Sequence, residues 1–75
     1  MMYALVTACV SLLQCTHGYY EIHHVTREQC EYMGERVLQG RKLVLDDGRV
    51  TTWMFEGCAE GRRPPKDMQK LGSIP

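Results

Sequence analysis

Apolar and mixed positions alternate along the first thirteen residues of the chain, the pattern of a β-strand with one covered face. Every second residue from Ala4 to Leu12 is apolar, whereas the alternate positions from Tyr3 to Leu13 include Tyr, Thr, Cys and Ser. Successive side chains of a strand point to opposite faces of its sheet. We therefore expect residues 2–13 to form a central strand, buried on one side and partly covered on the other.

A second strand is predicted over residues 19–25, where tyrosine, isoleucine and valine favour extended structure. Thr16, His17 and Gly18 stand between the two strands, and a cluster of these residue types favours a chain reversal. The two strands are therefore predicted to pair as an antiparallel hairpin that turns at residues 16–18.

A helix is indicated by signals at both of its ends. Thr26 and Gln29 have the spacing of a capping box, in which each side chain bonds to the backbone of the other residue. Gly40 suits the left-handed position that commonly follows the last turn. We expect a helix over residues 27–39, in which Gly34 allows a close approach to the sheet. Its predicted apolar stripe consists of Cys30, Met33, Val37 and Leu38.

A second hairpin is predicted over residues 41–45 and 50–56, two short strand-like segments. They flank an Asp-Asp-Gly-Arg sequence at residues 46–49, and an Asp-Gly pair favours a tight hairpin turn. Gly57 is expected to end the last strand. The order of elements is then β-β-α-β-β. We predict an α+β fold, a four-stranded antiparallel sheet with one helix packed on one face.

The composition changes after the last predicted strand. Residues 60–75 contain four basic and two acidic side chains together with a Pro-Pro pair. Such a segment favours extended, polyproline-like structure. We predict a single domain over residues 1–58 and an extended, basic, Pro-containing tail over residues 59–75. Removal of residues 61–75 is expected to leave the fold intact.

Length and charge narrow the possible functions. The chain of 75 residues carries nine Lys and Arg against nine Asp and Glu, so its formal net charge is zero with neutral histidines. Zero net charge excludes a strong overall field that attracts nucleic acid or mimics it. A chain this short buries a thin core with little room for a deep catalytic pocket. No apolar run approaches the ~20 residues of a membrane-spanning helix, so no membrane association is expected.

The chain contains four cysteines: Cys9, Cys15, Cys30 and Cys58. No Lys or Arg precedes Arg27, which argues against a secretion signal, because such signals begin with positive charge. We therefore expect a cytoplasmic protein whose reduced thiols act as small apolar side chains. Two disulfides are the alternative, with three pairings open. Cys30 and Cys58 would meet if the last strand runs under the helix.

Zinc binding is a weaker alternative, for which the candidate ligands are Cys15, His17, Cys30 and Cys58. Their spacing matches no ordinary pair of zinc knuckles, and neither a metal nor a cofactor is predicted. Cys15 and His17 are also the only Cys–His pair close in sequence, and no nearby carboxylate would orient the histidine. We therefore expect a protein without enzymatic activity.

Aromatic and arginine side chains dominate the binding energy of many protein–protein interfaces. The predicted sheet has one partly open face, on which aromatic side chains are exposed unless they fill the core. The candidate partner-binding residues are Trp53, Phe55, Tyr19, Tyr20, Arg49, Arg62 and Arg63.

Several short motifs occur together: an Ala-Leu-Val start, Cys9 and Cys15 near the end of the first strand, Thr-Arg-Glu-Gln-Cys at the helix start, and Cys58. With these motifs, residues 3–58 resemble small cysteine-containing prophage-encoded proteins of unknown function from enteric bacteria. The long first hairpin and the Asp-Asp-Gly turn depart from that pattern. The resemblance implies an accessory gene of a bacteriophage or mobile element and supplies no catalytic residues. Small proteins of such origin commonly bind and block a host protein.

We therefore predict a small viral protein in the host cytoplasm that binds a larger host protein and inhibits it by steric occlusion, including an anti-defence or anti-CRISPR role. One alternative is a nucleic-acid-associated regulator that uses the basic second hairpin and tail. The row of Glu28, Glu31 and Glu35 along the helix opposes that alternative. The other is a disulfide- or zinc-stapled secreted module. Partner identity and oligomeric state stay open.

Overall fold

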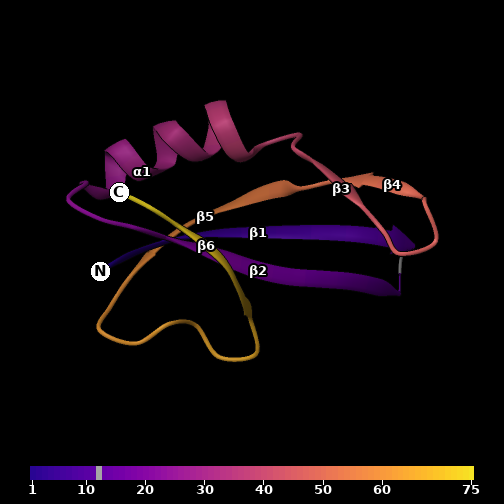
Figure 1. Cartoon of the computed structure of the whole chain (residues 1–75). Helices are drawn as coiled ribbons and strands as arrows, with labels where there is room; N and C mark the ends of the chain where they lie inside the picture. The colour runs from indigo at the N-terminus through magenta and orange to yellow at the C-terminus, as the bar shows by residue number, and fades with distance from the viewer. Residues whose placement is uncertain (12) are drawn as a thin grey trace.

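The computed structural model describes residues 1–11 and 13–75. Their strands form one four-stranded sheet and a separate two-stranded hairpin, and a helical segment lies between the first two strands and the hairpin along the chain (Figure 1). In chain order the elements are β1 (Met2–Ser11), β2 (Gln14–Ile22), α1 (Arg27–Met33), η1 (Gly34–Leu38), β3 (Lys42–Val44), β4 (Val50–Thr52), β5 (Met54–Glu60) and β6 (Gln69–Ile74).

The four-stranded sheet has the order β5-β1-β2-β6. β1 runs antiparallel to both of its neighbours, whereas β2 and β6 run parallel. The predicted α+β class is confirmed, but the prediction of one wholly antiparallel sheet is wrong. β3 and β4 pair only with each other, and β6 takes the fourth place in the main sheet. In Figure 1 the 61–68 connection, coloured orange to yellow, runs on the side of the strands away from α1.

The β1–β2 hairpin reverses earlier in the chain than predicted. Cys9 lies opposite Cys15, so residues 16–18 belong to β2 and form no turn. Gly18 is a glycine for another reason, because a Cβ there would lie 2.6 Å from Cδ1 of Leu71 on β6. The glycine thus marks a close approach between strands. Leu12, at the end of the predicted first strand, lies outside the described residues.

The predicted start of the helix is confirmed. The Thr26 side chain accepts a hydrogen bond from the backbone N–H of Gln29 (3.1 Å), and the Gln29 side chain accepts one from the backbone N–H of Thr26 (2.9 Å). Gly40 adopts a φ of +80°, the left-handed conformation expected after the helix.

The end of the helix differs from the prediction, because its last turn is the π-helical segment η1. The backbone N–H of Gln39 donates to the carbonyl of Gly34 (2.9 Å), which closes this wider turn. The additional residue in the turn changes which side chains face the sheet. Leu38 is 1% exposed, but Val37 is 48% exposed, so the predicted place of Val37 in the apolar stripe is wrong.

The core lies between the helical segment and one face of the sheet. Alternate residues of β1 are buried there, which confirms the apolar face predicted for the first strand. The core cluster contains Met2, Ala4, Val6, Ala8, Ile22, Cys30, Leu38, Trp53 and Cys58.

The opposite face of the sheet buries a tyrosine pair. The rings of Tyr3 and Tyr19 meet edge to face with centroids 5.5 Å apart, and both residues are buried. Burial, together with the nearby Glu21 carboxylate and Tyr19, raises the pKa of Tyr3 above its ordinary value. The sheet is therefore covered on both faces near the start of β1.

The segment predicted to be an extended tail is part of the sheet. β5 continues past Gly57, its predicted end, to Glu60, and β6 then pairs with β2. Leu71 and Ile74 of β6 pack against the core. They stand three residues apart because a bulge interrupts the β2–β6 register, so β6 lacks the simple alternation that indicates a strand.

Truncation after Met68 should destabilise the protein, contrary to the expectation for a dispensable tail. The shorter chain loses the β2–β6 pairing and the core contacts of Leu71 and Ile74. We expect the free energy of unfolding to fall by about 2 kcal/mol or more in urea denaturation. A chain that lacks only Pro75 is the control. Equal unfolding midpoints for the two truncated chains would contradict a structural role for β6.

Gly34 is needed where η1 contacts β5, as the sequence predicts. A Cβ at this residue would lie 2.2 Å from the ring atoms Cε1 and Cζ of Phe55. Gly34→Ala should lower the free energy of unfolding by about 1–3 kcal/mol, although alanine favours helices. Gly61→Ala is the matched control, because its Cβ would meet only the Arg63 carbonyl oxygen at 3.7 Å. A Gly34→Ala protein as stable as this control would show that the ring moves aside without cost.

Candidate functional site

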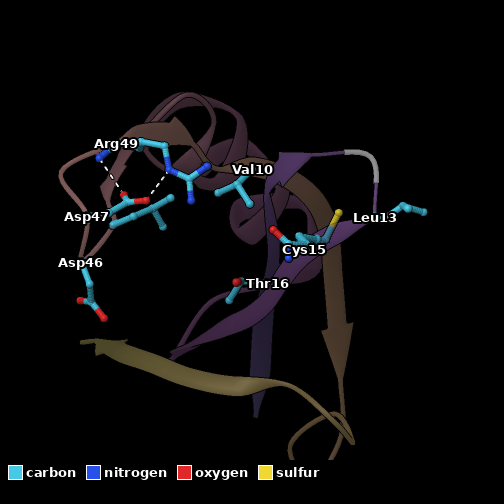
Figure 2. Close-up of a pocket in the computed structure, with 9 residues that line it drawn as sticks. Val10, Leu13, Cys15, Thr16, Asp46, Asp47 and Arg49 are labelled. Carbon is cyan, nitrogen blue, oxygen red and sulfur yellow. Dashed lines mark hydrogen bonds and ion pairs between the residues drawn. The ribbon is translucent and has the colours of Figure 1, made fainter.

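The β3–β4 hairpin meets the end of the β1–β2 hairpin at one end of the molecule. The hydroxyl of Thr51 on β4 donates a hydrogen bond to the carbonyl of Cys9 on β1 (2.9 Å), which holds the two hairpins together. Between them lies an open hollow of about 530 Å³ (Figure 2). It is lined by Val10, Leu13, Gln14, Cys15, Thr16, Leu45, Asp46, Asp47 and Arg49.

The turn of the β3–β4 hairpin is well ordered by its own hydrogen bonds, as its Asp-Gly sequence predicts. Gly48 has a φ of +86° and donates its N–H to the carbonyl of Leu45 (2.9 Å). The backbone N–H of Arg49 donates to Asp47 Oδ1 (3.0 Å), and the Arg49 guanidinium pairs with the same carboxylate. The backbone hydrogen bond from Arg49 contributes most to lowering the pKa of Asp47 below its ordinary value, and the Arg49 side chain lowers it further. Arg49 is therefore engaged in the turn.

The outer face of this hairpin carries an exposed apolar pair next to Lys42 and Thr52. Val44 and Val50 are cross-strand partners, so their side chains share one face, and they are 67% and 57% exposed. The next pair, Leu43 and Thr51, faces the other way, toward the rest of the protein. Leu13 is 95% exposed, and Figure 2 shows its side chain directed away from the β3–β4 hairpin. We call Val44 and Val50 the valine pair.

All four cysteines are paired in disulfides, so the prediction of reduced thiols is wrong. Cys9 is bonded to Cys15 across the β1–β2 hairpin, and Cys30 of α1 is bonded to Cys58 of β5. The second pairing is the one considered from the sequence. The first was not predicted because the turn had been placed at residues 16–18, whereas the observed register sets Cys9 and Cys15 opposite each other.

The weak zinc candidates do not form a metal site. Cys15, Cys30 and Cys58 have no thiol to offer, since each is in a disulfide. Nδ1 of His17 lies 3.1 Å from the Thr7 hydroxyl, in hydrogen-bonding contact. Within residues 1–11 and 13–75, no group of three or more His, Cys, Asp or Glu side chains is arranged to hold a metal ion. Cys15 and His17 likewise form no thiol–imidazole pair.

The structure places the predicted aromatic binding residues in or against the protein's own core. Trp53 and Tyr19 are each 6% exposed. Phe55 and Tyr20 are half-buried and pack against the core cluster. None of these four lines the hollow.

The three predicted arginines lie in two different places. Arg49 lies in the β3–β4 turn and lines the hollow. Arg62 and Arg63 are exposed in the connection between β5 and β6. Arg49, on the hairpin that carries the valine pair, thus lines the hollow together with Leu13 and Leu45. The sequence analysis did not single out Leu13, Leu45, Val44 or Val50. The available signal was the symmetric placement of Val44 and Val50 about the Asp-Gly turn.

No family model matches the sequence, and no curated protein or solved structure is significantly similar to it. In the described part of the chain, no helix is long and apolar enough to cross a membrane.

The two disulfides should differ in their contribution to stability. In the chain-entropy estimate, the bond between Cys30 and Cys58, 28 residues apart, contributes about 3.6 kcal/mol, and the bond across the six-residue separation of Cys9 and Cys15 about 2.2 kcal/mol. Replacing Cys30 and Cys58 by alanine should therefore lower the urea midpoint more than replacing Cys9 and Cys15.

Thiol titration of the denatured wild-type protein should detect no free thiol. Four titratable thiols in the purified protein would contradict both assignments.

Proposed function

We propose that this protein is a non-enzymatic binding module that docks on a larger protein through the end of its β3–β4 hairpin and blocks the surface it covers. The observation that supports this proposal is the valine pair, two large apolar side chains that stand more than half exposed on a hairpin outside the main sheet. Apolar side chains gathered on a projecting element are typical of protein–protein contacts.

The hairpin is suited to docking because it is held in one conformation before a partner arrives. A two-stranded ribbon is only marginally stable by itself in water. Here its inner face is fixed by the Thr51–Cys9 hydrogen bond, and its turn by the Asp47–Arg49 pair. The Cys9–Cys15 disulfide fixes the end of the β1–β2 hairpin, which the β3–β4 hairpin contacts. A preorganised surface loses less conformational entropy on binding.

The type of partner is proposed from the compartment and from the sequence motifs of residues 3–58. Two disulfides favour an oxidising compartment, such as the periplasm or the outside of the cell, over the cytoplasm predicted from the sequence. The resemblance of residues 3–58 to prophage-encoded proteins favours a bacterial host protein as the partner. We propose steric inhibition of such a host protein, an anti-defence role included.

Val44→Thr combined with Val50→Thr should weaken partner capture while the fold is kept. Threonine has nearly the same shape and strand preference as valine but replaces a methyl group by a hydroxyl. With the valine pair at the centre of the contact, affinity should fall by about tenfold or more. The measurement is pull-down from a bacterial lysate, with a photo-reactive side chain in place of Thr52, on the same face as the valine pair, to cross-link the captured protein.

Val37→Thr is the matched control, since Val37 is also exposed but lies on η1. It should capture the same protein in the same yield as the wild type. Undiminished capture by the double threonine variant would exclude the hairpin as the interface. Recovery of nucleic acid alone would favour the regulator alternative.

A further inference from the structure

The two edges of the four-stranded sheet are protected differently. On β5, the carbonyl of Cys58 accepts a hydrogen bond from the Arg27 guanidinium (2.9 Å). The backbone N–H of Phe55 donates one to Oε1 of Gln39 (2.8 Å). Both side chains occupy backbone groups that an additional strand would need. The β5 edge is therefore blocked at two positions.

β6 forms the other edge, and its outer side is open. The backbone N–H of His23 donates to the carbonyl of Ile74 (3.2 Å), so Ile74 directs its carbonyl toward β2. Successive residues of a strand direct their backbone groups to alternate sides, so the N–H and C=O of Ser73 point away from the sheet. No hydrogen bond joins this outer side to any other residue that the structure describes.

β6 also lacks an outward-facing charge that would repel an added strand. Exposed edge strands commonly carry lysine for this purpose. Lys70 is the one charged residue of β6, and its Nζ lies 3.4 Å from Oε2 of Glu21 on the neighbouring strand. The bulge in β6 precedes Gly72, which leaves residues 72–74 in regular register with β2.

The surface that leads into β6 is basic. Residues 61–75 contain four basic side chains and a single acidic one, Asp67. Arg62, Arg63 and Lys66 are exposed, and none of them forms an ion pair within the described chain. A strand that carries carboxylates would find complementary charge here.

We propose that the open edge of β6 binds an extended acidic segment of a partner protein by β-strand addition. The outward N–H and C=O of Ser73 pair with the backbone of that segment. Arg63 and Lys66, in the connection before β6, attract its carboxylates. This surface is separate from the valine pair, so the inference goes beyond the proposed function and does not depend on it.

The probe is an end-blocked peptide of alternating valine and glutamate, titrated at low salt into the isotope-labelled protein. Amide NMR signals at Ser73 and its neighbours should shift, and the exchange of the Ser73 amide hydrogen should slow. Ser73→Pro removes the outward N–H without removing a bond to β2, a place where edge strands tolerate proline. It should weaken peptide binding by about tenfold or more, whereas Ser73→Ala, which keeps the N–H, should bind like the wild type.

A second pair of variants tests the charge argument and keeps the test independent of any effect of proline on folding. Arg63→Glu with Lys66→Glu should weaken binding by about tenfold. Arg41→Glu with Lys42→Glu, at the β3 end of the molecule, makes the same change in net charge and should leave binding unchanged. Equal losses of peptide affinity in the two variants would contradict a local role of Arg63 and Lys66 in binding.

The following results would each contradict binding of an acidic strand at β6. Absence of shifts at β6 with millimolar peptide, or full binding by Ser73→Pro, overturns the proposal. A concentration-dependent dimer that Ser73→Pro abolishes would show that the edge takes a second copy of this chain instead. Single-stranded DNA that displaces the peptide would show a nucleic-acid surface instead. The valine-pair variants leave β6 unchanged, so failure here is distinguishable from failure of the proposed function.

Discussion

The attachment of the helical segment to β5 determines most of this structure. Cys30 of α1 is covalently bonded to Cys58 of β5, and the ring of Phe55 occupies the space beside Gly34, where any side chain would collide. The chain must therefore return from η1 to the start of β5 over the short segment of residues 39–53. That segment folds back on itself as the β3–β4 hairpin and stands outside the main sheet.

The same attachment leaves the sheet with two unlike edges. Arg27 of α1 and Gln39 after η1 reach backbone groups of β5 because the helix lies beside that strand. β6 lies at the opposite edge in the order β5-β1-β2-β6, and no side chain of the helical segment hydrogen-bonds to its backbone in the described residues. A helix that packed centrally over the sheet would reach neither edge. The protection of the β5 edge and the exposure of the β6 edge thus both follow from the contact of the helical segment with β5.

Local features of the fold could be predicted from the sequence, because their signals involve neighbouring residues. The capping box of Thr26 and Gln29 and the Asp-Gly turn are confirmed, as is the apolar face of the first strand. The parallel β6 and the Cys9–Cys15 bond could not be predicted, since both depend on register between strands. Gly18 illustrates the difficulty: a glycine that favours a turn locally lies in a strand, against the side chain of Leu71, far away in sequence.

The predicted aromatic binding residues lie in or against the core, and the thinness of that core explains why. Aromatic side chains bury more area than any others, so a small chain uses them first to stabilise itself. Trp53 and Tyr19 are accordingly buried, whereas Val44 and Val50 stay on the surface. The outward position of these valines follows from the pairing of β3 with β4, which places Leu43 on the inner face.

The size of the valine pair limits what it can do alone. Full burial of two valine side chains contributes about 3 kcal/mol, or about two orders of magnitude in affinity. Loss of translational and rotational freedom on association costs at least about 4 kcal/mol. Stable binding at the hairpin therefore needs further contacts, which the adjoining hollow, with Val10 and Leu45 in its lining, can supply. Strand addition at β6 relies on backbone hydrogen bonds instead, so the two surfaces would contribute to affinity through different interactions, and each can be disrupted without the other.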